Sequence, residues 1–98
     1  MRGRMSPDRL SGGSGLVSDG DYVAIFHSIH RVMKAEKILK SKQAPILLIP
    51  VPRQLSADCG LAIRYARDDR DLVEGFLREA DLPAAETFRK EGEDFILC

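Results

Sequence analysis

The chain has 98 residues, of which 44% are hydrophobic and 31% charged, a composition typical of one globular domain. Its 15 basic residues balance 15 acidic ones, and this zero net charge argues against a simple basic nucleic-acid binder and against an acidic tail protein. Two cysteines are too few for a disulfide-rich scaffold, and no apolar run approaches the roughly 18 residues of a membrane span.

The first 20 residues differ in composition from the rest of the chain. Ten of them are Gly, Ser or Pro, and few are apolar. Such a segment buries too little surface to offset the entropy lost on ordering, and it lacks the apolar stretch of a secretory signal. We therefore expect residues 1–20 to be a disordered leader, a vector-derived segment or a mis-assigned start. Residues 21–98 are expected to form a single domain.

The first half of this domain predicts a strand, a helix and a second strand. Residues 22–27 form a short apolar run rich in β-formers, which is typical of a buried strand. Ser28 is placed to cap a helix over residues 29–42, whose apolar face repeats with helical spacing. Residues 46–49 form a second apolar strand, and Pro50 ends it because proline cannot donate to a strand ladder.

The second half predicts a strand, a helix and a further extended region. Residues 61–65 alternate apolar and polar side chains, and residues 70–80 carry an amphipathic helical pattern that includes Leu72. Residues 86–89 and 95–97 look extended, either as one bulged strand or as a hairpin around Glu91-Gly92. The resulting βαββαβ order predicts a ferredoxin-like α+β fold. Its four-stranded sheet would have both helices on one face and the strand order 4-1-3-2.

The connection between the two middle strands carries the residues that are best suited to take part in a chemical reaction. Residues 49–60 read IPVPRQLSADCG, and the two prolines favour a fixed loop conformation. Cys59 is a candidate thiolate, Arg53 its stabilising cation and Ser56 a hydrogen-bond donor. Gly60 would let a partner approach the sulfur closely. The alternative is that Cys59 is a small buried hydrophobic residue at the start of a strand.

The expected topology then places other groups relative to Cys59. The C-terminus would end the fourth strand at the Cys59 end of the sheet, two strands and about 10 Å away, where Cys98 could act as a resolving thiol. We expect the same end to receive the C-terminus of the first helix, with Lys40 and Lys42. His27 and His30 would lie at the opposite end, which argues against a Cys-His pair. Because they have no neighbouring ligands at metal-binding spacing, we expect no metal and no cofactor.

Several of these segments resemble a family of small bacterial domains described as selenium/sulfur carrier protein-like. The resemblance covers residues 22–65 best, and Ala57 departs from it where a second small polar residue is expected. The family resemblance implies that Cys59 carries sulfur or selenium as a persulfide or selenopersulfide. The matching positions are Ser28, Ala35, Glu36, Pro50, Pro52, Arg53, Ser56, Cys59 and Gly60.

Two main functions follow from these observations. The first is a thiol carrier in the cytoplasm that depends on a desulfurase-like or selenocysteine lyase-like donor and on an acceptor protein, and is not a complete enzyme by itself. The second is a non-catalytic ferredoxin-like module that binds a ligand or protein and keeps Cys59 inert. RNA binding through the sheet is a third interpretation that the six aromatic residues support weakly.

The zero net charge conceals two oppositely charged halves. Residues 31–67 hold eight basic and two acidic residues, whereas residues 68–98 hold four basic and ten acidic residues. In one interpretation the two halves attract one another across adjacent helices. In the other, the basic residues form a rim that steers an acidic partner toward Cys59. In the second case Lys34, Lys37 and Lys40 of the first helix would bind the partner.

Overall fold

The computed structural model describes residues 17–55 and 60–98 and shows an α+β domain with a five-stranded antiparallel sheet. The strands lie in the order β2-β3-β1-β4-β5, and a short 3-10 turn, η3, precedes the second helix. Neither helix of the described chain is long and apolar enough to cross a membrane. In chain order the elements are β1 (Tyr22–Ile25), α1 (Ile29–Ser41), β2 (Ile46–Pro50), β3 (Leu61–Tyr65), η3 (Arg67–Asp69), α2 (Arg70–Glu79), β4 (Glu86–Glu91) and β5 (Asp94–Leu97).

The predicted βαββαβ order and the arrangement of its four strands are found, but the sheet has one strand more than expected. The two extended segments near the C-terminus form a hairpin and not one bulged strand. Phe88 of β4 pairs with Leu97 of β5, and Glu91 pairs with Asp94. Gly92 adopts a φ of 61° in the intervening turn, a conformation that glycine tolerates and most residues do not. β5 therefore extends the sheet beyond β4.

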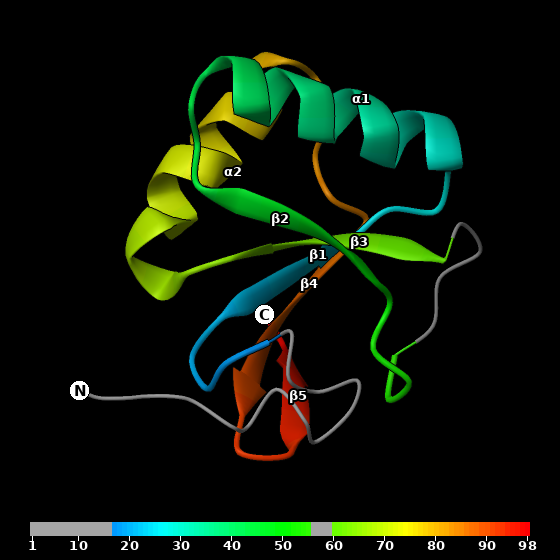
Figure 1. Cartoon of the computed structure of the whole chain (residues 1–98), viewed down its shortest axis with the longest axis vertical. Helices are drawn as coiled ribbons and strands as arrows, with labels where there is room; N and C mark the ends of the chain where they lie inside the picture. The colour runs from blue at the N-terminus through cyan, green and yellow to red at the C-terminus, as the bar shows by residue number, and fades with distance from the viewer. Residues whose placement is uncertain (1–16, 56–59) are drawn as a thin grey trace.

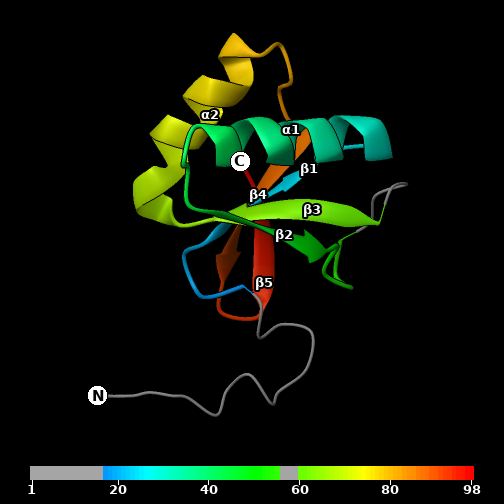
Figure 2. The same ribbon diagram turned by 45° about the horizontal axis from the view of Figure 1, so that its top comes forward.

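Both helices pack on one face of the sheet and enclose the larger core, as Figures 1 and 2 show. Val32, Ala35 and Leu39 of α1 are fully buried there because they recur at helical spacing. Two residues of the predicted helix patterns are exceptions, since Ile29 is 43% exposed and Leu72 is 45% exposed. Each lies in the first turn of its helix. The remaining core residues come mainly from α2, β1 and β3: Val73, Leu77, Tyr22, Ala24, Ile63 and Tyr65.

A second, smaller core forms on the opposite face of the sheet. Val23 and Ile25 alternate with the helix-facing residues of β1 and pack there against side chains of β2, β3, β4 and β5. Val17 is only 4% exposed in this cluster, although we assigned it to the leader. Residues 17–20 are also held by hydrogen bonds, including one from Gly20 N to Lys90 O of 2.8 Å. Residues 1–16, the rest of the expected leader, lie outside the described part of the chain.

One end of the sheet, which we call the Gly60 end, brings together the ends of β1 and β2 and the starts of β3 and β4. β1 ends there with Ile25 opposite both Ala62 of β3 and Glu86 of β4. Pro50 pairs with Leu61 at the same end, where β2 finishes and β3 starts. Because α1 follows β1, the helix begins at this end and ends at the other. Figures 1 and 2 show the N-terminal turn of α1 on the same side of the molecule as the start of β3.

Candidate functional site

The cysteine loop is described on both of its flanks. Cys59 and Ser56 lie outside the described residues, whereas Arg53 and Gly60 lie within them. Val51 N donates a hydrogen bond of 3.0 Å to Gly60 O, which continues the β2–β3 ladder one step past its last strand pair. Gly60 has a φ of 75°, and nothing lies within 4 Å of the position that a Cβ would take. The residue after Cys59 is therefore exposed and in a glycine-favouring conformation.

The segment before Cys59 is anchored to the rest of the domain. Leu55 N donates to Pro52 O over 2.9 Å, so the chain turns at Arg53, whose side chain is exposed. Leu55 packs against the second core, and Gln54 Nε2 lies 3.5 Å from Glu93 O in the β4–β5 turn. The hairpin that the sequence left undecided thus contacts the loop that leads to Cys59. Arg53 is held at the base of that loop and faces solvent.

The N-terminus of α1 lies at the Gly60 end, contrary to the expectation from the sequence. The β1–β3 register ends where Ile25 pairs with Ala62, so His27 follows the end of β1 and Gly60 precedes the start of β3 at the same end of the sheet. Ser28 caps α1, because its Oγ accepts from Arg31 N at 3.4 Å. The expected placement of His27 at the opposite end was wrong, because a strand finishes at the same end of the sheet where its antiparallel neighbour starts. This pairing direction alone could have revealed the error.

A pocket of about 320 Å³ opens at this helix terminus. His27 and Arg31 are exposed basic residues on its wall, and the terminus itself carries a partial positive charge. The connection from α2 to β4 closes the other side, where Ala85 N donates to Ile25 O over 2.8 Å. The lining residues are Phe26, His27, Ser28, Arg31, Pro83 and Ala85. Such surroundings favour anions, including a thiolate.

The lysines of α1 extend away from the Gly60 end. The helix rises about 1.5 Å per residue, so Lys40 lies roughly 16 Å along the axis from Ile29. Lys40 forms an ion pair of 3.2 Å with Glu36 in the same helix. Lys42, at the C-cap, has its Nζ 5.6 Å from the centre of the Phe76 ring of α2. The expectation that the C-terminus of α1 lies beside the start of β3 was therefore wrong.

The basic and acidic halves do not meet through ion pairs between the helices. Within residues 17–55 and 60–98, the pairs that involve a helix join residues of one helix, Lys40 to Glu36 and Arg70 to Glu74. Lys34 and Lys37 are exposed on the outer side of α1. The structure thus brings His27 and Arg31 to the Gly60 end in place of the lysines.

Cys98 occupies a different position from the one expected. It follows β5 and not β4, and its backbone N–H donates to Thr87 O over 2.9 Å. β5 stands three positions from β3 in the sheet, which corresponds to about 14 Å. The thiol is exposed, with Sγ 3.6 Å from Ile96 O. A direct disulfide with a residue at the start of β3 would require the chain to move.

Other chemistry is sparse in the described part of the chain. Within residues 17–55 and 60–98, no group of three or more His, Cys, Asp and Glu side chains is arranged to hold a metal ion. Phe88 and Phe95, the aromatic residues of the sheet face away from the helices, pack into the second core. They are therefore not arranged as free stacking platforms for bases.

The comparisons with known proteins identify one family. No curated protein and no solved structure matches the chain. A family model, described as "putative Se/S carrier protein-like", matches residues 21–89. This range includes β1 to β3, both helices, the whole cysteine loop and part of β4, and it ends before β5. Because the match covers more than two thirds of the 98 residues, the chain belongs to this Se/S carrier protein-like family.

Proposed function

We propose that the protein carries sulfur or selenium on Cys59, as a persulfide or selenopersulfide, between a donor and an acceptor protein. The family assignment supports a carrier role. The observation that carries the proposal is the β1–β3 register, in which β1 ends with Ile25 opposite Ala62, so that α1 begins at the end of the sheet where β3 starts. Cys59 is joined to Gly60 by one peptide bond, so their Cα atoms are about 3.8 Å apart. Gly60, the residue that follows Cys59, therefore lies at the end of the sheet where α1 begins.

The electrostatic surroundings of that end support a thiolate. A cysteine becomes nucleophilic when a helix N-terminus or a nearby cation stabilises its deprotonated form. The α1 terminus supplies the partial charge, and His27 and Arg31 supply basic side chains. Arg53 adds a cation at the base of the loop, and Ser56 would donate a hydrogen bond to the sulfur. The exposed Gly60 leaves room for a partner protein to approach.

The transfer step needs no added oxidant or reductant. The Cys59 thiolate attacks the outer sulfur of a persulfide on the donor protein. The sulfur–sulfur bond of the donor breaks, and its own thiolate leaves with the electron pair. A new sulfur–sulfur bond forms on Cys59, so one disulfide-type bond replaces another. A desulfurase-like or selenocysteine lyase-like donor has this chemistry, and an acceptor thiolate unloads Cys59 by the same step.

Labelled sulfur tests the proposal directly. The protein is incubated with a cysteine desulfurase and isotopically labelled L-cysteine, and the intact mass is then measured without reductant. We expect one labelled sulfur atom per chain in the wild type and in Cys98→Ser, and none in Cys59→Ser. Equal labelling of wild type and Cys59→Ser would refute a carrier role for Cys59.

Thiol reactivity separates the carrier from an inert binding module. In the Cys98→Ser background, only Cys59 can react with an alkylating reagent. A carrier should show an alkylation pKa below the ordinary thiol value of about 8.5. Slow alkylation at neutral pH with an ordinary pKa would favour the module.

A further inference from the structure

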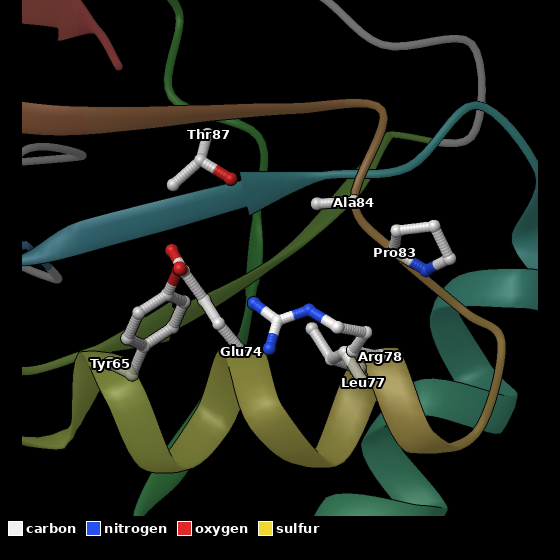
Figure 3. Close-up of a pocket in the computed structure, with 7 residues that line it drawn as sticks. All are labelled: Tyr65, Glu74, Leu77, Arg78, Pro83, Ala84 and Thr87. Carbon is white, nitrogen blue, oxygen red and sulfur yellow. The ribbon is translucent and has the colours of Figure 1, made fainter.

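A second pocket lies between α2 and β4, separate from the cysteine loop. Its volume is about 220 Å³, smaller than the roughly 300 Å³ at which pockets for drug-sized ligands begin. Figure 3 shows the side chains of Tyr65, Glu74, Arg78 and Thr87 directed toward a common space. Leu77, Pro83 and Ala84 supply apolar parts of the wall. The pocket is therefore suited to a small molecule with several polar groups.

The Glu74 carboxylate is held in place from two sides. The Tyr65 hydroxyl donates to Glu74 Oε2 over 3.3 Å, and Arg70 Nε lies 3.4 Å from the same oxygen. Tyr65 is fully buried, and this burial together with the charge of Glu74 raises its pKa, so the hydroxyl keeps its proton. Both of these contacts use Oε2, which leaves Oε1 to accept from a ligand. Glu74 thus presents an oriented negative group to the pocket.

Arg78 supplies the opposite charge. It lies four residues after Glu74 on α2, and its guanidinium extends toward the same space in Figure 3. Such a spacing often brings an ion pair together, yet no described pair joins Arg78 to Glu74 within 4.0 Å. The described ion pairs do not include Arg78 at all. A positive and a negative group therefore face one small pocket without neutralising each other directly.

We propose that this pocket binds a free α-amino acid with a small side chain. The α-carboxylate would pair with Arg78, and the α-ammonium would donate to Glu74 Oε1 and to the Thr87 hydroxyl. A compact zwitterion satisfies both charges within this volume, and the apolar wall would contact its side chain. The proposal does not depend on Cys59, because the cysteine loop contributes no residue to the pocket.

Binding of L-alanine to the full chain tests the proposal. Isothermal titration measures the affinity, and amide NMR locates the site through the signals of Leu77, Ala84 and Thr87. We expect these signals to shift with L-alanine and to stay unchanged with N-acetyl-L-alanine or L-alaninamide, each of which lacks one charge. Equal binding of either analogue, or no shift at millimolar L-alanine, would overturn the proposal.

Two variants and a control complete the test. Arg78→Gln and Glu74→Gln should each weaken L-alanine binding by about tenfold or more, because each removes a charged hydrogen-bond partner. Arg67→Gln is the matched control, since this exposed arginine does not line the pocket, and it should bind as the wild type does. Unchanged affinity in folded Arg78→Gln would contradict the assignment. Cys59→Ser should keep full affinity, which separates this result from that of the sulfur-loading experiment.

Discussion

Ile25 pairs with Ala62 at the last step of the β1–β3 ladder, and this pair defines which groups surround the cysteine loop. β1 ends at the position where β3 begins, so the helix that follows β1 starts beside the loop that precedes β3. The N-terminus of α1 and His27 are therefore at the Gly60 end. A parallel pairing would instead have brought the C-terminus of α1 and its lysines there.

The first prediction concerns which basic residues assist a donor protein. Arg31→Glu should slow sulfur loading several-fold at low salt, because Arg31 lines the pocket at the Gly60 end. The double variant Lys37→Glu with Lys40→Glu should load at the wild-type rate, since these residues follow α1 toward its other end. Loading rates at two salt concentrations measure both effects, and the Arg31 effect should shrink at higher salt. Slower loading in the lysine variant alone would restore the basic-rim interpretation.

The second prediction concerns the thiolate of Cys59. In the Cys98→Ser background, His27→Gln should raise the alkylation pKa of Cys59 toward the ordinary thiol value, because a basic group at the Gly60 end is lost. His30→Gln is the matched control, since His30 lines a different pocket with Lys34 and Asp81. The measurement is the alkylation rate as a function of pH. An equal shift in both variants would show a general charge effect and not a local one.

The third prediction uses the buried hydroxyl of Tyr65. Burial and Glu74 raise its pKa above the value of about 10 for an unfolded tyrosine. The folded state keeps the proton while the unfolded state loses it, so this residue's contribution to stability is present below pH 10 and declines above it. The free energy of unfolding should therefore fall as pH rises above 10, and less steeply in Tyr65→Phe. At neutral pH, Tyr65→Phe should cost about 1 kcal/mol through the lost hydrogen bond.

Urea denaturation across this pH range measures the effect, with Tyr22→Phe as the control. Tyr22 stacks on Tyr65 with ring centres 5.7 Å apart, so both variants alter the same aromatic pair. The two variants differ in the hydrogen bond to Glu74, which Tyr65 makes and Tyr22 does not. Parallel pH curves for wild type and Tyr65→Phe would contradict the prediction.

The fourth prediction compares two glycines with open surroundings. Gly60→Ala should destabilise the protein by about 1–2 kcal/mol, because a residue with a Cβ is strained at a φ of 75°. Gly75→Ala should stabilise it by roughly 1 kcal/mol, because Gly75 lies inside α2 without a positive φ. Neither added Cβ would have a neighbour within 4 Å, so the backbone conformation accounts for the opposite signs. Denaturation midpoints that move in the same direction would contradict this explanation.

The fifth prediction concerns Cys98. With about 14 Å between strands three positions apart, mild oxidation of the native monomer should form no disulfide between Cys59 and Cys98. Mass analysis of peptides digested under non-reducing conditions would reveal such a bond. After sulfur loading on Cys59, the Cys98→Ser variant should also release the sulfur to an acceptor thiol at the wild-type rate. Slower release in this variant would instead support a resolving role for Cys98.

The local parts of the fold were predictable because they depend on neighbouring residues. The apolar spacing of Val32, Ala35 and Leu39 predicted α1, and the alternation in β3 predicted that strand with its observed bounds. Ser28 was also identified correctly as the cap of α1. The sequence did not decide between a β4–β5 hairpin and one bulged strand, because both alternatives have the same extended residues. Only the cross-strand pairing of Phe88 with Leu97 distinguishes them.

The sequence by itself determined the order of helices and strands, the family and the candidate cysteine, because periodicity and a local motif are carried by adjacent residues. Tertiary structure decided which groups meet, since that depends on strand direction across the sheet. It places His27 and Arg31 at the Gly60 end and Cys98 directly after a fifth strand. It also places Glu74, Arg78 and Thr87 around one pocket. The zero net charge of the chain is consistent with all these arrangements, because a sum contains no positions.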